Sequence, residues 1–286
     1  MISMQNKKYC YPNSDVLINK LNVKIQNKLN IVEMEYSITR LNQLQGTPVK
    51  GEFDFKHLKR IHHYIFQDIY DWAGKERTVE IGKGNLFCLT TYIPTFAESI
   101  FKNYFNQCYE NRNDKEKFIV ALAENYGDLN ALHPFREGNG RAQREFAREL
   151  CLACGYQFDL SCTTHEKMLH ASKLSFDIRD NSEFIKIFSE AVTPLEQAKE
   201  SEKLYILTSN DIELGIKNST EYKYDEYTED EYLKYYKEKT KTSETHRRIT
   251  NESIDRKMIC KTNKSKDKHE INSYSYDEYE EKDLHS

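Results

Sequence analysis

Residues 133–144 bring together several side chains that could act on a phosphorylated substrate. The stretch reads His-Pro-Phe-Arg-Glu-Gly-Asn-Gly-Arg-Ala-Gln-Arg. His133 belongs to the residue type that titrates near neutral pH, which suits it to take a proton from a hydroxyl group. Glu137 offers a carboxylate oxygen, the type of ligand that holds Mg²⁺ beside substrate phosphates. With the glycines and arginines that follow, these two residues predict a site for phosphate-transfer chemistry.

The second half of the stretch predicts the anion-binding part of that site. Gly138 and Gly140 are expected to take positive φ, so that backbone N–H groups around Asn139 can converge on a phosphate. A helix is expected to begin here and to point its positive N-terminal end at the same place. Arg141 and Arg144 share one face of that helix and lie close enough to its start to clamp phosphates.

Each of these parts also has a common structural explanation. A Gly-Asn-Gly sequence is more often a turn than a phosphate loop, and a histidine before a proline often only ends a helix. Arginines in the first turn of a helix oppose its dipole and suggest surface ion pairs. The presence of all the parts in this order is much more specific than any one of them. We therefore treat residues 133–144 as the candidate active site.

A group of thiols further along the chain offers a competing metal site. The ligand types that zinc prefers are present at Cys151, Cys154, Cys162 and His165. Cys151 and Cys154, however, fall inside the helix expected after Gly140, where small thiols usually pack as apolar residues. The packing interpretation is therefore favoured over zinc.

The elements that must position the candidate site are mainly helical. Apolar spacing predicts longer helices over 31–46, 55–70, 93–111, 115–132 and 141–154, with shorter ones between 164 and 192. Asn113 is expected to cap the helix over 115–132, with Glu116 completing a capping box and Pro134 stopping it. His62 and His63 point to different faces of their helix, which favours one interfacial and one exposed histidine over a metal pair.

One segment has a convincing β pattern. Residues 78–81 alternate, residues 82–85 supply a turn and residues 86–89 return, which predicts a hairpin. A hairpin of this kind can present a strand edge to an extended peptide. From the local pattern alone, a surface excursion between helices is the favoured interpretation.

The bulk composition limits the class of protein. The chain has 286 residues, of which 38% are hydrophobic and 31% charged, so it can build one large or two small domains with some part poorly packed. A net charge of −4 argues against direct binding of nucleic acid. Seven cysteines, without a visible secretory signal or membrane-spanning run, favour free thiols in the cytoplasm. The same pattern is compatible with export of the protein by a secretion system that reads a C-terminal signal.

The composition changes beyond about residue 194, where lysine, glutamate, aspartate and tyrosine dominate. We therefore divide the chain into an N-terminal lead-in over 1–30, a helical domain over 31–195 and a charged tail over 196–286. The tail is expected to be partly helical or disordered. It contains the tetrapeptide Tyr-Asp-Glu-Tyr twice, at 224–227 and 276–279. This repeat suggests an alternative in which the tail docks a partner or is modified on tyrosine.

The stretch 133–144 resembles, at every position, the signature of the Fic (filamentation induced by cyclic AMP) family. Gly-Thr-Pro-Val at 46–49, Asp-Ile-Tyr-Asp-Trp-Ala-Gly at 68–74 and the hairpin turn are similar to the bacterial branch of that family. The resemblance covers about residues 9–192. It implies an all-α fold in which the signature loop joins two central antiparallel helices, with the hairpin as a small β flap.

The resemblance also implies a protein adenylyltransferase, which transfers AMP from ATP to a serine, threonine or tyrosine hydroxyl of a target protein. His133 would be the catalytic base and Glu137 the ligand of Mg²⁺. The phosphates of ATP would be bound by Gly138, Asn139, Gly140, Arg141 and Arg144. The flap would contact the target or the nucleotide through Lys83, Gly84 and Asn85. The alternatives are transfer of another nucleotidyl or phosphoryl group, or a non-catalytic protein that acts through its tail.

Two further details bear on the type and regulation of such an enzyme. The related Doc branch, which transfers a γ-phosphate, has a lysine where this chain has Gly140, so glycine favours AMP transfer. Many Fic proteins carry an inhibitory Ser/Thr-x-x-x-Glu-Gly/Asn segment whose glutamate pairs with the arginine corresponding to Arg144. Thr240 to Glu244 fits the first five positions, but Thr245 follows. We therefore expect a separate small antitoxin protein to supply the inhibitory glutamate.

Overall fold

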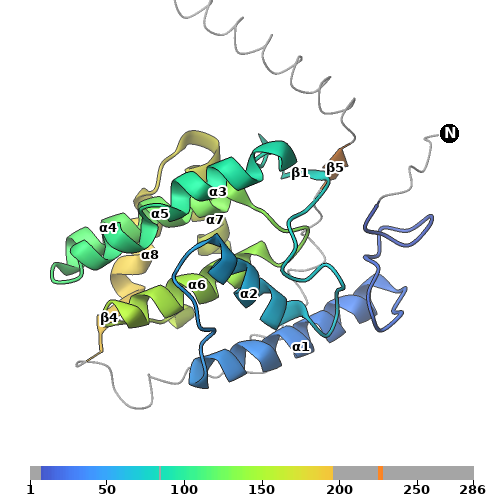
Figure 1. The fold of residues 1–286 in the computed structure, drawn as a ribbon, viewed down its shortest axis with the longest axis horizontal. Helices are drawn as coiled ribbons and strands as arrows, with labels where there is room; N and C mark the ends of the chain where they lie inside the picture. Colours follow the sequence, from blue (N-terminus) through green and yellow to red (C-terminus); the bar gives the residue numbers. More distant parts are fainter. Residues whose placement is uncertain (1–7, 84, 196–224, 228–286) are drawn as a thin grey trace, which may run out of the picture. The chain divides into compact units, whose positions relative to one another are not determined.

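The computed structural model describes residues 8–83, 85–195 and 225–227, which fall in one compact unit spanning 1–229. α-Helices form most of the described structure (Figure 1). They are α1 (Gln26–Gly46), α2 (Phe55–Phe66), α3 (Ile93–Phe101), α4 (Tyr104–Glu110), α5 (Lys115–Leu132), α6 (Asn139–Ala153), α7 (His165–Ile178) and α8 (Ser182–Ala191). Two short 3₁₀ helices of the described residues, η1 (Thr90–Tyr92) and η2 (Leu160–Cys162), precede α3 and α7.

Short strands form two small antiparallel sheets in the described part of the chain. In one, β1 (Glu80–Lys83) lies between β2 (Asn85–Leu86) and β5 (Asp225–Tyr227). In the other, β3 (Tyr156–Phe158) pairs with β4 (Val192–Pro194). The prediction of a helical fold with a small β flap is confirmed. The third strand of the flap sheet was not foreseen from the sequence.

Helices α5 and α6 lie at the centre of this unit. α6 packs against α2, α5 and β3, while α3, α4, α7 and α8 all contact α5. Tyr126 and Leu129 of α5 and Phe146 and Leu150 of α6 are buried almost completely. Burial of apolar surface stabilises such a core by about 25 cal/mol per Å². The loop that joins α5 to α6 is therefore anchored at both ends in the best-packed part of the protein.

The strongest helix prediction, over 115–132, is confirmed by α5, but its cap is different. Asp114 rather than Asn113 is the N-cap, and its carboxylate accepts a hydrogen bond from the Lys117 N–H. The single helix predicted over 93–111 is wrong, because the chain leaves the helical region at Asn103 (φ −125°) and divides into α3 and α4. Asparagine is a weak helix former, so a break at this residue is physically reasonable, although its side chain makes no capping hydrogen bond to α4.

Three other predicted elements form with shifted boundaries. α1 begins at Gln26 rather than at residue 31, so its first turn lies within the segment assigned to the N-terminal lead-in. α2 ends at Phe66 rather than near residue 70, but Ile69 and Tyr70 still reach the core through the turn that follows. The hairpin is confirmed with a tighter turn, since Lys83 pairs directly with Asn85. The tail predicted over 196–286 lies outside the described residues, apart from β5.

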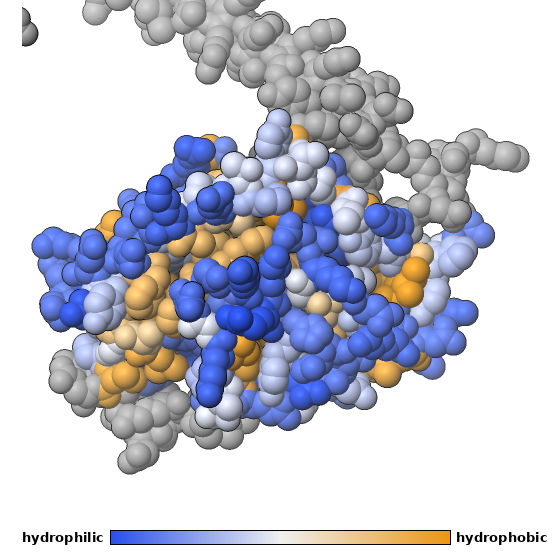
Figure 2. Space-filling view, in the orientation of Figure 1, coloured by the Kyte–Doolittle hydropathy of each residue, from blue (hydrophilic) through white to orange (hydrophobic). Residues whose placement is uncertain are grey.

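The surface shown in Figure 2 is mainly hydrophilic, with apolar residues visible between the polar ones. Large apolar side chains that reach the solvent include Tyr92 and Ile178, which are 62% and 67% exposed. Single apolar residues of this kind are normal on a protein surface. Among the helices that the structure describes, none is both long and apolar enough to cross a membrane.

Candidate active site

Residues 133–138 form the loop between α5 and α6. His133 closes α5 in the left-handed region, with φ 43°, and Gly138 forms the N-cap of α6 with φ 79°. Left-handed residues end a helix and turn the chain away from its axis. Pro134 then prevents α5 from continuing, because it has no N–H to donate. α5 therefore ends at His133 and Pro134, and α6 begins at Gly138, only a few residues later.

His133 is held in one tautomer by its surroundings. Its Nδ1 lies 2.9 Å from the carbonyl oxygen of Asn130, which can only accept a hydrogen bond, so Nδ1 carries the proton. The Nε2 atom of the neutral ring then bears the lone pair that can accept a proton. The ring stacks on Phe87, with 3.7 Å between centroids and 11° between planes. The ring of His133 therefore has a fixed orientation, which a general base needs in order to reach a substrate hydroxyl.

Asn139 fixes the shape of the loop. Its Oδ1 accepts a hydrogen bond from the Phe135 N–H at 2.9 Å, and its Nδ2 donates to the Phe135 carbonyl at 2.7 Å. The side chain is completely buried. Its predicted contribution to an anion site therefore rests on its backbone N–H, since the amide group is engaged with the loop.

The two glycines of the loop differ in conformation. Gly138 has the expected positive φ, and a Cβ there would lie 2.2 Å from the ring of Phe66. The expectation of positive φ for Gly140 is wrong, because this residue already lies inside α6. A Cβ at Gly140 would instead lie 2.9 Å from the guanidinium of Arg144. Glycine at 140 thus makes room for a side chain from the next turn of the same helix.

The start of α6 offers backbone donors for an anion. The first hydrogen bond of the helix runs from the Ala142 N–H to the Gly138 carbonyl at 3.1 Å. The N–H groups of Asn139, Gly140 and Arg141 precede that bond, so they point out of the N-terminus of the helix. Such groups, together with the helix dipole, favour a phosphate or carboxylate.

Arg141 and Glu137 belong to a charged network that reaches α1. The Arg141 guanidinium lies 2.5 Å from Glu33 and 3.6 Å from Glu137, donates to Ser37 and covers the ring of Phe66. Burial and the neighbouring Glu33 raise the pKa of Glu137. Burial lowers the pKa of Arg141, but the two carboxylates outweigh it and raise the pKa overall. Glu33, whose role no local sequence pattern indicates, therefore holds Arg141 in place and partly balances its charge.

Arg144 lies on the same face of α6, one turn further on. Burial raises the pKa of Tyr126, and the charge and hydrogen bond of Arg144 partly offset that rise. The Arg144 side chain therefore reaches Tyr126 of α5 and also fills the position next to Gly140 where a larger side chain would lie. The structure thus brings both signature arginines and Glu137 to the start of α6, as the sequence predicts.

Arg77 connects the flap to the catalytic loop and was also missed. It is almost fully buried, and burial lowers its pKa. Its guanidinium donates to the carbonyl oxygens of His133, Val79 and Cys88 and to the carboxylate of Glu80. A lone arginine in a polar stretch carries no local signal of such a role. Because these partners come from two separate segments, only the folded chain reveals the connection.

Known proteins share both the sequence and the fold of this unit. A model described as the Fic/DOC family matches residues 52–151. The probable protein adenylyltransferase Fic of Escherichia coli is 35% identical over 196 residues, which cover 68% of this chain and 94% of that protein. The chain belongs to the Fic/DOC family. Protein adenylyltransferase VbhT of Bartonella schoenbuchensis is 38% identical over 172 residues, but these are 60% of this chain and only 36% of VbhT.

Solved structures of Fic proteins have the same fold. The N-terminal Fic domain of a VirB-translocated Bep effector protein from Bartonella quintana, with bound ADP, is 26% identical, with a TM-score of 0.61. The match covers 69% of this chain and 98% of that domain. The BepC protein of Bartonella tribocorum, with bound AMPPNP, has a TM-score of 0.60 at 24% identity, over 65% of this chain and 96% of that one. The all-α Fic fold predicted from the signature is thereby confirmed.

In this Fic protein the signature loop is also supported from α2. His62 is fully buried and stacks on Phe135, with 3.8 Å between ring centroids. Its Nδ1 accepts a hydrogen bond from the Gly74 N–H at 2.8 Å, and its Nε2 lies 2.9 Å from the Glu137 carbonyl. The neighbouring His63 is exposed, so the prediction of one interfacial and one exposed histidine is confirmed.

The burial of His62 makes the stability of the fold sensitive to acid. Burial lowers the pKa of His62 from 6.5 to about 3. Between these values the unfolded chain binds more protons than the folded one, so stability is complete above pH 6.5 and is lost as the pH falls toward 3. The expected contribution is about 1.4 kcal/mol for each pH unit in this window.

Urea denaturation at a series of pH values between 7 and 4 would measure this effect as the free energy of unfolding. His62→Gln is expected to be less stable at pH 7 but to show a flatter dependence on pH. His63→Gln, a matched change at the exposed neighbour, is expected to keep the wild-type slope. If the free energy of unfolding depended on pH equally in the wild type and in His62→Gln, His62 would not be the source of the acid sensitivity.

The flap residues named from the sequence are only partly described by the structure. Lys83 and Asn85 face each other across the hairpin at the ends of β1 and β2. Gly84 lies outside the described residues. Their predicted contact with a target or with the nucleotide stays a prediction.

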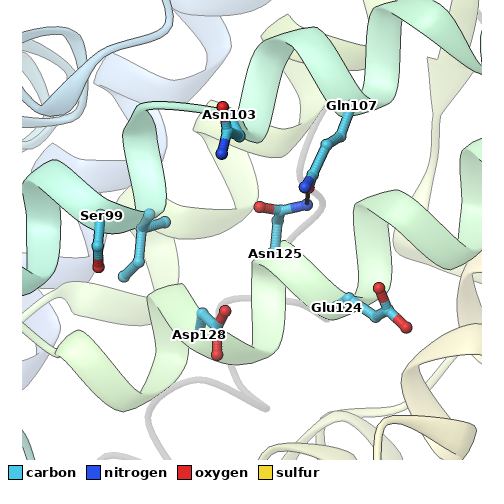
Figure 3. Close-up of a pocket in the computed structure, with 7 residues that line it drawn as sticks. Ser99, Asn103, Gln107, Glu124, Asn125 and Asp128 are labelled. Carbon is cyan, nitrogen blue, oxygen red and sulfur yellow. Dashed lines mark hydrogen bonds between the residues drawn. The ribbon is translucent and has the colours of Figure 1, made fainter. Parts of the chain in front are cut away.

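A hollow of about 200 Å³ lies among α3, α4 and α5, and none of the signature residues lines it. Figure 3 shows Asn125 of α5 facing Gln107 of α4, to which it donates a hydrogen bond at 2.7 Å. Other polar residues at its wall are Ser99, Asn103, Glu124 and Asp128. We assign this hollow no part in the reaction.

The thiols considered as a competing zinc site are divided between different environments. Cys151 and Cys154 are buried at the end of α6, whereas Cys162 is exposed. Within the described residues, no group of three or more His, Cys, Asp or Glu side chains is arranged to hold a metal ion. Burial raises the pKa of Cys151 and of Cys154.

Proposed function

We propose that the protein is an adenylyltransferase that moves AMP from ATP to a serine, threonine or tyrosine hydroxyl of another protein. The observation that carries this proposal is the His133 ring, oriented by its contact with the Asn130 carbonyl, in the same short loop that opens α6. A base and an anion site on one rigid loop suit the attack of a hydroxyl on a phosphate. Two relatives, VbhT and the Escherichia coli protein Fic, are named as a protein adenylyltransferase and a probable protein adenylyltransferase, which supports the same activity.

The proposed reaction uses His133 as the base. The target hydroxyl gives its proton to Nε2 of His133 while its oxygen forms a bond to the α-phosphorus of ATP. The bond from that phosphorus to the bridging oxygen breaks, and pyrophosphate leaves with the electron pair. Backbone N–H groups of Asn139 and Gly140 bind the phosphates, with Arg141 and Arg144 on the β- and γ-phosphates. Gly138, whose own N–H donates to the Glu137 carboxylate, provides the turn that brings these groups together.

Glu137 fits a magnesium ion by its chemistry. Its carboxylate lies next to the phosphate-binding N–H groups, and one oxygen accepts a hydrogen bond from the Gly138 N–H at 2.8 Å. The pKa of this carboxyl is raised by burial and by Glu33, so a nearby cation would favour its charged form. We propose that Glu137 is the protein ligand of Mg²⁺, which would neutralise charge on the leaving phosphates.

The flap and the tail complete the proposed enzyme. We propose that residues 31–195 form the catalytic domain, that the flap around Lys83, Gly84 and Asn85 contacts the target or the nucleotide, and that residues 196–286 form an extension. A separate antitoxin supplying a glutamate to Arg144 would regulate it. The protein would act in the cytoplasm of its own cell as a toxin or, after secretion, in a host. Solved neighbours include VirB-translocated effectors.

Labelled ATP tests the proposal directly. The full chain is incubated with cell lysate and ATP labelled at the α- or the γ-phosphate, with His133→Asn as the control. Protein labelling from α-labelled ATP alone, lost in the variant, is the expected result. Labelling from γ-labelled ATP alone would overturn AMP transfer in favour of phosphoryl transfer. Label from neither form would favour a non-catalytic protein that acts through its tail.

A further inference from the structure

One edge of the flap is covered by a segment from much further along the chain. β5 pairs with β1 in antiparallel orientation, with Tyr227 opposite Glu80, Glu226 opposite Ile81 and Asp225 opposite Gly82. The strand order β2-β1-β5 places it on the side of β1 that the hairpin leaves open. Figure 1 shows β5 beside β1.

The backbone of β1 explains which groups make this pairing. The Ile81 carbonyl accepts a hydrogen bond from the Phe87 N–H, so the polar groups of Ile81 face β2. Successive residues of a strand turn their N–H and C=O groups to opposite sides. The polar groups of Glu80 and Gly82 therefore face β5, opposite Tyr227 and Asp225. Gly82 has no side chain to oppose the approach of a second strand.

The covered edge is tightly linked to the catalytic loop. Phe87, just beyond β2, stacks on the ring of His133. Arg77 donates hydrogen bonds both to the His133 carbonyl and to the carboxylate of Glu80, the first residue of β1. A peptide strand on this edge is thus held in a fixed position relative to the base, because the flap cannot move without disturbing these contacts.

The chemistry of the occupant is that of a possible substrate segment. β5 comes from the Tyr-Asp-Glu-Tyr tetrapeptide at 224–227, which recurs at 276–279. Extended peptides bind a sheet edge chiefly through main-chain hydrogen bonds, so one occupant excludes another. An internal segment is present at a high effective concentration and competes well with a separate protein.

We infer that the tail segment Asp225–Tyr227 is a competitor in cis, which occupies the edge of β1 where the target protein pairs and so slows its modification. This inference rests on the proposed function, because it assumes a protein substrate. The tail, rather than only a separate inhibitor, sets how much target the enzyme modifies.

The test compares two substitutions at one residue of β5 in the full chain. Asp225→Pro removes an N–H that faces β1 and breaks the pairing, since proline cannot donate. Asp225→Ala removes the same carboxylate but keeps the N–H. Asp277→Pro makes the same change in the second copy of the tetrapeptide and serves as a further control.

Amide hydrogen exchange measures the pairing of β1 with β5 independently of AMP transfer. In Asp225→Pro the Glu80 and Gly82 amides are expected to exchange about tenfold faster or more, since an exposed strand edge is hardly protected. In the same variant, modification of lysate proteins with α-labelled ATP is expected to rise severalfold, and a peptide with the sequence of residues 221–231 is expected to lower it again. Asp225→Ala and Asp277→Pro are expected to match the wild type in both measurements.

Each other outcome has a definite meaning. Unchanged exchange at Glu80 and Gly82 in Asp225→Pro would overturn the pairing, whatever the activity. Faster exchange with no gain in target labelling would overturn the competition. AMP found on Tyr224 or Tyr227 of the wild type would also overturn it, because the segment would then be a substrate. No labelling in any variant would refute the proposed function, while the exchange measurement would still decide the pairing.

Discussion

Replacing His133 with asparagine is expected to lower kcat for AMP transfer by about 10²- to 10⁴-fold, the usual contribution of a general base. Asparagine tolerates the left-handed conformation that His133 adopts (φ 43°) better than most residues. Its amide can also donate to the Asn130 carbonyl, but it has no basic nitrogen. Steady-state rates with α-labelled ATP would measure the loss, and calorimetry with ATP is expected to show nearly unchanged nucleotide affinity.

His133→Ala provides the comparison that separates the base from the fold. Alanine loses the stack on Phe87 as well as the hydrogen bond to Asn130, and it is less suited to positive φ. We therefore expect His133→Ala to lower the melting temperature more than His133→Asn, although both are nearly inactive. If His133→Asn kept more than about a tenth of wild-type kcat, His133 would not be the base.

Gly138→Ala is expected to be the most damaging change of a single methyl group in the loop. It imposes positive φ (79°) on alanine, which costs about 1–2 kcal/mol. The new Cβ would lie 2.2 Å from the Phe66 ring, so the loop or the ring must move, at a further cost of about 1–3 kcal/mol. Because a shift of about 1 Å can cost about 10²-fold in rate, kcat should fall by a similar factor.

Gly155→Ala is the matched control, because Gly155 also has positive φ (88°) but has nothing within 4 Å of the added methyl group. It is expected to lose only the conformational part of the stability, about 1–2 kcal/mol, and to keep wild-type kcat. Urea denaturation and labelling rates on both variants would measure the difference. Equal losses of stability and of kcat in the two variants would show that the clash between the added methyl group at 138 and the Phe66 ring is unimportant.

The sequence was most informative where a structural feature depends on residues close together in the chain. Helix α5 is predicted within its observed bounds, because its apolar stripe and its stop at Pro134 are local properties. Its cap was assigned one residue too early, since Asn113 and Asp114 are both suitable acceptors. The division between α3 and α4 was missed because Tyr104 and Cys108 continue the apolar spacing of α3, and only the conformation of Asn103 breaks the helix.

In the candidate site too, the sequence predicts only what depends on residues close together in the chain. Residues 133–144 could be assigned to phosphate chemistry because a base, a carboxylate and an anion-binding helix start follow one another in a single loop. The residues that hold this loop come from elsewhere: Glu33 pairs with Arg141 from α1, His62 stacks on Phe135 from α2, and Arg77 ties the loop to the flap. None of them has a local pattern that separates it from an ordinary helix or surface residue.

The sequence by itself determined the chemistry of this Fic protein: the order His133, Glu137, Gly138 and Arg141 is a property of the chain before it folds. Only the tertiary structure decided which nitrogen of His133 can take a proton, because that depends on the Asn130 carbonyl. It also decided that Arg141 shares its charge with Glu33 and that residues 225–227 pair with the flap. Hydrogen bonds and charges act over a few ångströms in space, and separation along the sequence does not reveal which groups will meet at that distance.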